Sequence, residues 1–287
     1  MDYKTIISKK RSVRNYKKDT VDDKVFDELK IYYKNHKKLV DGIEIEILVK
    51  SKNDVYEKLK GVAGYKGIML EAPHYIIILS DEKQNYIENA GYVVESIMVK
   101  AYDLGVGSCW ITFDDGELIK EKLSIKSDKK LAGLIALGFD DNKLKIFNEP
   151  KTGDNPSKAD IRFEEDNVTI MLDVEDIVFI EKWGNRADAD ELQIRGLLDA
   201  FNFARFAPSS LNRQPWRFII DKDFVILALK KDPMVSEYDS KVDIGIVMLY
   251  FDLIVNNSIK DTNWQLGKPD KEYNVPDDFL IVGSCSI

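Results

Sequence analysis

The chain has 287 residues, of which 44% are apolar and 32% charged, and its 42 basic and 50 acidic side chains give a net charge of −8. This acidic balance argues against a nucleic-acid partner, which usually binds a basic face, and the apolar content argues against a disordered chain. The two cysteines and two histidines exclude a disulfide framework and show no spacing typical of a metal site.

The first residues and the lengths of the apolar runs bear on location. Residues 1–4 open on charge, unlike a secretory signal. Apolar runs such as 75–79 and 224–229 are far shorter than the ~20 residues that cross a bilayer. We therefore expect a cytoplasmic protein that forms one large domain or two modest ones.

In the first half of the chain, periodicity predicts two helices and three strands. One helix begins at 20–23, where a threonine and two aspartates suit a helix N-terminus, and runs to about His36. Apolar residues at steps of three and four predict an amphipathic helix at 87–104, which glycines end at 105–107. Apolar or alternating runs predict strands at 43–49, 75–79 and 131–139.

Residues 148–173 interrupt this pattern with prolines, a glycine and many charges, and predict a linker with a short edge strand at 168–172. The pattern then restarts with a helix at 191–206, strands at 216–220 and 224–229, and a strongly apolar helix at 242–255. The chain is therefore expected to divide into a first half, 1–150, a linker, 151–173, and a second half, 174–287.

The restart indicates an internal repeat. Aligning the strand residues 47–49 with 218–220 gives an offset of 171 (218 − 47), and aligning Gly91 with Gly245, each early in its long helix, gives 154 (245 − 91). The offsets agree if the second half lacks 17 residues (171 − 154) between strand and helix. From periodicity alone, two diverged copies of one helix–strand–strand–helix unit and two unrelated α+β segments are equally good interpretations.

The first motif with chemical meaning places three cations and a hydroxyl in five residues, Lys10, Arg11, Ser12 and Arg14 around Val13. In an extended segment Lys10, Ser12 and Arg14 would point one way and the other two the opposite way. Guanidinium groups bind phosphate oxygens through paired charged hydrogen bonds, and serine adds a neutral donor. The alternative is a solvated basic patch, since further lysines lie nearby.

The second motif is the segment 207–218, which reads APSSLNRQPWRF. Pro208 stops the preceding helix, and two hydroxyls and two amides then line a loop before the next strand opens. A loop of this kind can present short polar groups to a planar ligand. The alternative is a capped connection between a helix and a strand.

These motifs resemble those of a known family. Residues 10–14 resemble the Arg-Arg-Ser-x-Arg signature of the FMN-dependent nitroreductases, and 207–218 resemble their Pro-Ser-Ser-x-Asn-x-Gln-Pro-Trp segment. Residues 89–92 and 104–111 are similar to the family's core helix and the loop after it. The resemblance implies a nitroreductase-like α+β fold, an α/β sandwich that forms an intertwined homodimer with FMN at the subunit interface, each subunit supplying one motif.

The spacing of the motifs departs from the family, in which both lie near the N-terminus. Here Arg14 and Pro208 are 194 positions apart (208 − 14). Where the first copy would carry the Ser-Ser-x-Asn loop it has KKLVD at 37–41, and where the second would carry the basic motif it has KWGNR at 182–186. Because the losses are complementary, we expect two copies fused into an intramolecular pseudo-dimer, a monomer that keeps one composite flavin site.

The resemblance implies ten cofactor ligands, taken from the positions that align with the family's motifs: Lys10, Arg11, Ser12, Arg14, Ile111, Thr112, Pro208, Ser209, Ser210 and Asn212. The basic motif would hold the phosphate and ribityl chain, and its cations would stabilise negative charge on the reduced flavin. Lys10 keeps the positive charge of the family's arginine but lacks the paired N–H donors of a guanidinium group. The backbone at 110–112 would approach flavin N5, although relatives often have glycine or glutamate where this chain has Thr112.

Some further features match the family poorly, leave alternatives open or have an ordinary structural interpretation. Residues 64–67 would lie near the pyrimidine ring, but they match the family poorly. The basic residue that completes the phosphate site in relatives would be Lys151, Lys158 or Arg162. Cys109 is expected to be a packing thiol, and the glycines at 105–107 lack the third glycine of a dinucleotide fingerprint.

The function implied by the resemblance is that of an FMN-dependent oxidoreductase. NAD(P)H would pass a hydride to flavin N5 and leave, and a nitroaromatic, quinone or similar acceptor would take its place in a ping-pong reaction. No side chain need act as acid or base, so no catalytic residue and no metal are predicted. The alternatives are a flavin-binding sensor or storage protein without turnover and a structural module that binds no flavin.

Overall fold

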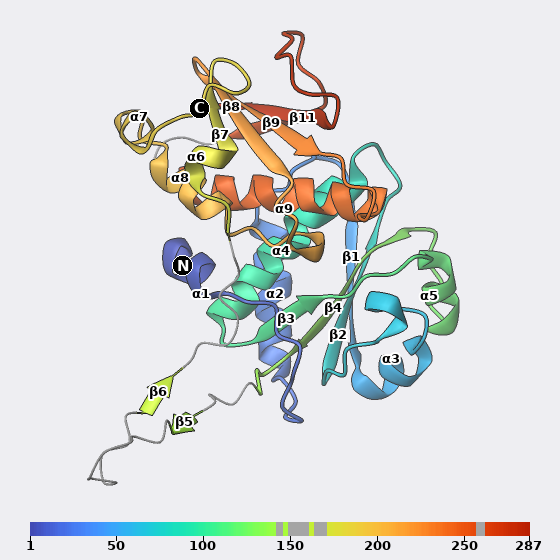
Figure 1. Cartoon of the computed structure of the whole chain (residues 1–287). Helices are drawn as coiled ribbons and strands as arrows, with labels where there is room; N and C mark the ends of the chain where they lie inside the picture. The colour runs from blue at the N-terminus through green and yellow to red at the C-terminus, as the bar shows by residue number, and fades with distance from the viewer. Residues whose placement is uncertain (142–145, 149–160, 164–170, 257–261) are drawn as a thin grey trace, which may run out of the picture.

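The computed structural model of the chain describes residues 1–141, 146–148, 161–163, 171–256 and 262–287 (Figure 1). Two long helices, α4 (Tyr86–Asp103) and α9 (Glu237–Val255), cross at the centre. One sheet lies on each side of this helix pair. None of the described helices is both long and apolar enough to cross a bilayer.

The first half builds a four-stranded sheet in the order β1-β2-β4-β3, with every neighbouring pair antiparallel. Its strands are β1 (Ile45–Ser51), β2 (His74–Ser80), β3 (Gly107–Trp110) and β4 (Lys130–Gly138). Around them lie α1 (Tyr3–Lys9), α2 (Asp23–Asn35), α3 (Lys52–Leu59), η1 (Tyr65–Gly67) and α5 (Gly116–Lys122).

The continuous apolar run of β2 follows from burial on both of its faces. Ile76 and Ile78 join the main core under α4, whereas Tyr75, Ile77 and Leu79 join a second core that α3 and α5 cover. A strand with one solvent-exposed face would show alternating apolar and polar residues.

The second half builds a five-stranded sheet in the order β10-β11-β9-β8-β7. Its strands are β7 (Val178–Ile180), β8 (Trp216–Asp221), β9 (Phe224–Lys230), β10 (Asn263–Leu266) and β11 (Phe279–Ser286). The helices are α6 (Val174–Ile177), α7 (Ala189–Ile194), α8 (Leu198–Ala204) and the short η2 (Ser210–Asn212). A separate hairpin pairs β5 (Ile146–Asn148) with β6 (Ile161–Phe163).

The two sheets have the same topology. The order β8-β9-β11-β10 repeats the order β1-β2-β4-β3, and each central helix follows the second strand of its sheet. The second sheet adds β7, which pairs in parallel with β8; among the described residues nothing pairs in this way with β1. The predicted fold, two diverged copies of one α+β unit, is confirmed.

The crossing of the two helices is reciprocal. A Cβ placed on Gly91 would lie 2.4 Å from the Val242 carbonyl oxygen, and one placed on Gly245 would lie 2.0 Å from the Glu88 carbonyl oxygen. Gly245 is 154 positions after Gly91, and Val242 is 154 positions after Glu88 (242 − 88). Each helix therefore receives the other at equivalent positions, as in a two-fold symmetric interface.

One predicted helix was wrong in its bounds. The helix expected at 191–206 is two helices, α7 and α8, because Gly196 adopts φ +71° between them and ends the first. The helix start expected at 20–23 is confirmed: α2 begins at Asp23 and is capped by the Asp22 carboxylate, which accepts the Lys24 N–H. Of the strand expected at 168–172, residues 171 and 172 are not in a strand and the rest lies outside the described residues.

Candidate functional site

The basic motif begins where α1 ends. Lys10 closes the helix by donating its N–H to the Ile6 carbonyl, and the chain then runs beside β3, with the Val13 N–H donating to the Ser108 carbonyl at 3.0 Å. A Cβ at Gly107 would lie 2.5 Å from Cγ2 of Val13. Glycine at 107 therefore lets the motif lie flat against the strand.

The side chains of the motif differ in exposure. Val13 is buried and packs on β3 at Gly107. Burial raises the pKa of the Cys109 thiol, and Arg14, Lys10 and a hydrogen bond from Ser12 oppose that shift. Of the three cations, Arg11 and Arg14 are exposed to solvent.

Lys10 is held inside the molecule. Its ammonium lies 2.6 Å from Oε1 of Glu95, and the two side chains are only 5% and 0% exposed. The same carboxylate accepts the Trp110 indole N–H at 2.9 Å and the Tyr250 hydroxyl at 3.1 Å. Glu95 thus ties the basic motif to β3, α4 and α9, and the charge of Lys10 is compensated within the fold.

The loop of the second motif, residues 208–214 (the Pro-Ser-Ser loop), has a strained backbone. Leu211, Asn212 and Gln214 have φ angles of +51°, +54° and +47°, a region that residues other than glycine rarely adopt. The loop is closed on itself, since the Gln214 N–H donates to Oγ of Ser209 at 3.0 Å and the Asn212 N–H donates to the Ser209 carbonyl at 3.0 Å. Strain of this kind persists only where the surroundings enforce it, and it concentrates at functional sites.

Two anchors fix this loop to the rest of the protein. The Ser210 N–H donates to both carboxylate oxygens of Asp243 on α9, at 3.0 and 3.1 Å. Oε1 of Gln214 accepts the Leu172 N–H at 2.8 Å. Asp243 is 3% exposed, and burial raises the pKa of its carboxyl well above the usual range. The loop therefore sits on α9 two residues before the glycine of the helix crossing.

The segment expected near flavin N5 meets the segment expected near the pyrimidine ring. The Ile111 N–H donates to the Leu134 carbonyl at 2.8 Å, and the Thr112 carbonyl accepts the Gly64 N–H at 2.8 Å. Gly64 has φ +93°, and a Cβ there would lie 2.0 Å from the Ile68 carbonyl oxygen, so only glycine fits. Ile111 is buried and Thr112 is exposed, which leaves Thr112 as the accessible member of the pair.

The motifs from the two copies therefore attach to one scaffold. Glu95 on α4, which also accepts the Tyr250 hydroxyl from α9, holds Lys10, and Asp243 on α9 holds Ser210. A pocket of about 290 Å³ is lined by Phe113, which follows Thr112 in the chain, and by Tyr238 at the start of α9, whose rings lie 5.0 Å apart. Its other lining residues include four acidic side chains and one basic one, Glu82, Asp114, Asp115, Glu117 and Lys130.

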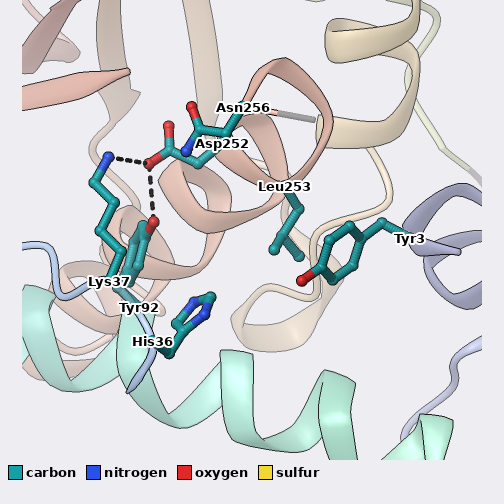
Figure 2. A pocket seen from close by; sticks show the side chains of 7 residues that line it. All are labelled: Tyr3, His36, Lys37, Tyr92, Asp252, Leu253 and Asn256. Atoms are coloured by element: carbon teal, nitrogen blue, oxygen red, sulfur yellow. Dashed lines mark hydrogen bonds and ion pairs between the residues drawn. The ribbon is translucent and has the colours of Figure 1, made fainter. Parts of the chain in front are cut away.

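The other end of the helix pair repeats the buried network with different residues. Figure 2 shows a pocket of about 220 Å³ that Tyr3, His36, Lys37, Tyr92, Asp252, Leu253 and Asn256 line. The Asp252 carboxylate accepts from the Lys37 ammonium at 3.1 Å, the Tyr92 hydroxyl at 2.9 Å and the Trp264 indole at 2.8 Å. Trp264 is 154 positions after Trp110 (264 − 110), so the two indoles are equivalent.

The lysine of this second network lies in the segment of the first copy that aligns with the Pro-Ser-Ser loop. Lys37 belongs to the 37–41 segment that stands where the first copy would carry the Pro-Ser-Ser loop, and at an offset of 171 it corresponds to Pro208 (37 + 171). Its ammonium also donates to the Thr262 carbonyl. A side chain from the loop position thus reaches into the core at this end, which the proline at the other end cannot do.

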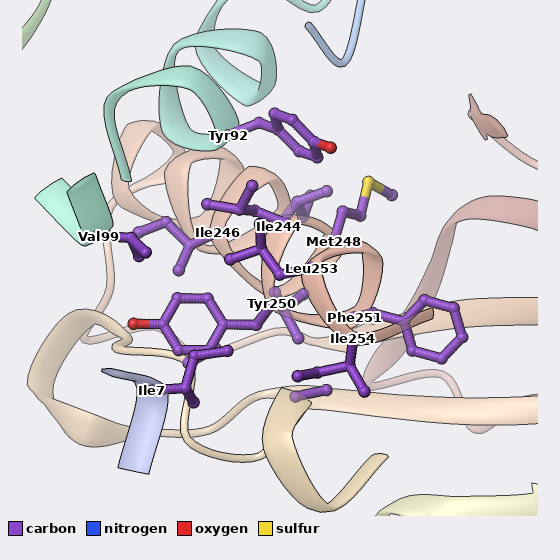
Figure 3. Close-up of a cluster of buried hydrophobic side chains, with 14 of the residues drawn as sticks. Ile7, Tyr92, Val99, Ile244, Ile246, Met248, Tyr250, Phe251, Leu253 and Ile254 are labelled. Carbon is purple, nitrogen blue, oxygen red and sulfur yellow. The ribbon is translucent and has the colours of Figure 1, made fainter. Parts of the chain in front are cut away.

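The helix that carries both anchors is packed on all sides. Figure 3 shows Met248 and Phe251 on one side of α9 and Tyr250 on the opposite side. Residues 242–255 of α9 are all buried, and the rings of Phe251 and Phe218 stack 6.1 Å apart against the second sheet. An apolar helix of this kind holds its few polar side chains in fixed positions.

Some predicted site residues cannot be placed. Lys151 and Lys158 lie outside the described residues, and for Arg162 in β6 only the backbone is described. Sequence reasoning also missed Glu95, Asp243 and Tyr250. The signal was present, since a carboxylate inside an apolar helical stretch is seldom buried without a partner.

Comparison with known proteins identifies the family and the fold of the chain. A family model described as "Putative TM nitroreductase" matches residues 2–175 and 185–255. A "putative nitroreductase" structure from Thermotoga maritima msb8 is 17% identical, with a TM-score of 0.57, over 100% of this chain and 94% of that one.

Two smaller nitroreductases match about half of the chain. The FMN-dependent nitroreductase from Clostridium difficile R20291 is 24% identical (TM-score 0.42) over 50% of this chain and 91% of its own. The nitroreductase with bound FMN from Bacteroides fragilis NCTC 9343 is 18% identical (TM-score 0.42) over 56% and 100%. No curated protein sequence matches. Because the family model covers most of the chain, this protein belongs to the nitroreductase family that the model describes.

Proposed function

We propose that this chain is an FMN-dependent oxidoreductase that takes electrons from NAD(P)H and passes them to a nitroaromatic, quinone or similar acceptor. The observation that carries the proposal is that Lys10 and Ser210, which belong to motifs of different copies, are both anchored to the α4–α9 pair. The family membership and the relatives named as FMN-dependent or FMN-bound support the choice of cofactor.

The residues present fit FMN by the chemistry of their donors. Arg14 offers an exposed guanidinium fork to a phosphate, and Ser12 adds a neutral donor. Lys10 holds the start of this segment on α4 through Glu95. Pro208, Ser209, Ser210 and Asn212 offer short polar groups and a strained backbone that a planar ring can approach.

The chain's own residues would position and polarise the cofactor. When bound, FMN supplies the two-electron chemistry of the reaction. Arg14 would stabilise negative charge on the bound cofactor, because a preset cation needs no reorganisation when the charge appears. Ile111 uses its N–H within the sheet, so Thr112, whose N–H has no partner among the described residues, is the donor we assign to the ring. The pocket between Phe113 and Tyr238 would admit the acceptor.

The asymmetry between the two ends supports one FMN per chain. At one end the loop supplies Ser209 and Ser210, and at the other the equivalent segment supplies Lys37, whose ammonium is committed to Asp252. The two copies, 1–150 and 174–287, would then act as the two subunits of a dimer within one monomeric chain.

Absorption spectroscopy of the purified protein tests this proposal. We expect bound FMN near one per chain and loss of the long-wavelength flavin band when NADH or NADPH is added without oxygen. Two tightly bound flavins per chain would contradict the composite site. Bound flavin that neither nicotinamide reduces would favour a sensor or storage protein, and a preparation that stays colourless after FMN is added would refute the proposal.

A further inference from the structure

In both copies, a backbone N–H of the segment that follows the outer helix (α2 or α8) donates to a side chain of the central helix (α4 or α9). In the second copy the Ser210 N–H donates to Asp243, and in the first copy the Val40 N–H donates to Oδ1 of Asn89 at 3.0 Å. Ser210 is 170 positions after Val40 (210 − 40), and Asp243 is 154 after Asn89 (243 − 89). These offsets match those of the strands and helices to within one residue, so the two contacts are equivalent.

The equivalent contacts differ in their chemistry. Asp243 receives the Ser210 N–H between two carboxylate oxygens, at 3.0 and 3.1 Å. Asn89 accepts with one oxygen, and its buried Nδ2 has no hydrogen-bond partner in the described part of the chain. The copy that keeps the Pro-Ser-Ser loop therefore has the carboxylate, and the copy that has lost the loop has the amide.

A buried carboxylate is costly unless its contacts repay the loss of water. Asp243 is 3% exposed, and the described structure gives it no cation. The contact it does make stands immediately before the strained residues Leu211 and Asn212. Residues held in such a conformation destabilise the loop, so the loop needs a firm anchor to remain in place.

We propose that Asp243 is a positioning residue of the flavin site, which holds Ser210 so that Ser209, Ser210 and Asn212 are fixed before FMN binds. This inference rests on the proposed function. Asp243 acts through the loop backbone and is assigned no contact with the cofactor. The amide at the equivalent position in the first copy is the natural control, because Asn89 holds a segment that contributes no motif.

The test exchanges the two side chains in the full-length chain. Asp243→Asn leaves one acceptor oxygen where there were two and turns an amide NH2 donor toward the loop, so the Ser210 N–H is held less firmly. We expect the Kd for FMN to rise about tenfold, with a changed visible circular dichroism spectrum of the bound flavin. Asn89→Asp should leave both unchanged. Leu211→Gly removes the steric cost of φ +51° and should restore part of the affinity in the Asp243→Asn chain.

Equal Kd values for the wild-type and Asp243→Asn chains would overturn the inference while leaving the proposed function intact. A wild-type chain that binds no FMN would overturn both. If the Asp243→Asn chain does not fold, hydrogen exchange on the wild type decides: the Ser210 amide should be protected before FMN is added. Protection that arises only after FMN binds would show that the cofactor, and not Asp243, orders the loop.

Discussion

Replacing Gly245 by alanine tests the helix crossing that supports the whole site. The added Cβ would lie 2.0 Å from the Glu88 carbonyl oxygen and 2.6 Å from the Tyr92 nitrogen, both of them backbone atoms of α4. Ordinary van der Waals contact begins near 3.4 Å, so the helices must separate by more than 1 Å at this point. Side-chain rotation cannot relieve the clash.

The magnitude follows from two opposing effects. Alanine improves helix propensity over glycine by about 1 kcal/mol, whereas overpacking a buried contact costs about 1–3 kcal/mol and occasionally more. Because this clash is between backbone atoms, we take the upper end of the overpacking range, about 3 kcal/mol. Subtracting the gain in helix propensity leaves a net loss of about 2 kcal/mol in the free energy of unfolding. At about 2 °C per kcal/mol for a chain of this size, Tm should fall by about 4 °C.

Urea unfolding of three single variants and two double variants measures the effect. Gly91→Ala should behave like Gly245→Ala, since its Cβ would lie 2.4 Å from the Val242 carbonyl oxygen. One separation of the helices relieves both clashes, so the double variant should lose less than the sum of the singles. Gly105→Ala is the control: nothing lies within 4 Å, and its cost at φ +79° should add to that of Gly245→Ala.

If only helix propensity mattered, Gly245→Ala would stabilise the protein. If Gly245→Ala is neutral or raises Tm, the two helices do not approach as closely as the structure has them. If the Gly91 and Gly245 variants are additive, the two glycines do not share one contact, and the reciprocal interface within the chain is refuted.

Three further predictions concern the two ends of the helix pair. Arg14→Ala and Asn212→Ala should each weaken FMN binding by up to a few kcal/mol in a fluorescence titration; if only Arg14→Ala does so, the composite site loses its support. Tyr92→Phe removes a buried donor from Asp252 and should cost about 1–2 kcal/mol in urea unfolding, and an unchanged midpoint would mean that this hydrogen bond contributes nothing. Burial lowers the pKa of His36 to about 4 in the folded state, so the unfolded chain takes up a proton first and stability should decrease as pH falls from about 6.5 to 4; a His36→Gln chain with the same pH slope would contradict this.

The elements that sequence patterns predicted are those whose pattern arises from their own burial. β2 is apolar along its length because both of its faces are covered, and α4 and α9 are apolar because they form the centre. β10 and β11 escaped prediction, since an edge strand and its partner show weak alternation and lie next to segments rich in turn residues. Gly196 shows the same limit within a helix, because only its backbone angle separates α7 from α8.

The two motifs of the candidate site can be found in the sequence, but the side chains that anchor them cannot. The cations at 10–14 and the loop at 207–218 stand out locally, because polar groups gather there without periodicity. The place of Lys10 depends on a carboxylate 85 positions away on α4, and that of Ser210 on a carboxylate on α9. No local pattern reveals such pairs, because the partners lie far apart in the sequence and only the packing within each half of the chain brings them together.

The two ends of the helix pair also explain how a motif can be lost without loss of the fold. At each end a lysine, a buried carboxylate, an indole and a tyrosine from the opposite helix form one network, around Glu95 at one end and Asp252 at the other. Removing one partner from such a network is strongly destabilising, because a buried charge is left uncompensated. The exposed groups of Arg14 and Asn212 carry no such cost. Selection for stability alone would therefore retain both networks, and only selection for a ligand would retain the exposed motifs, which remain at one end.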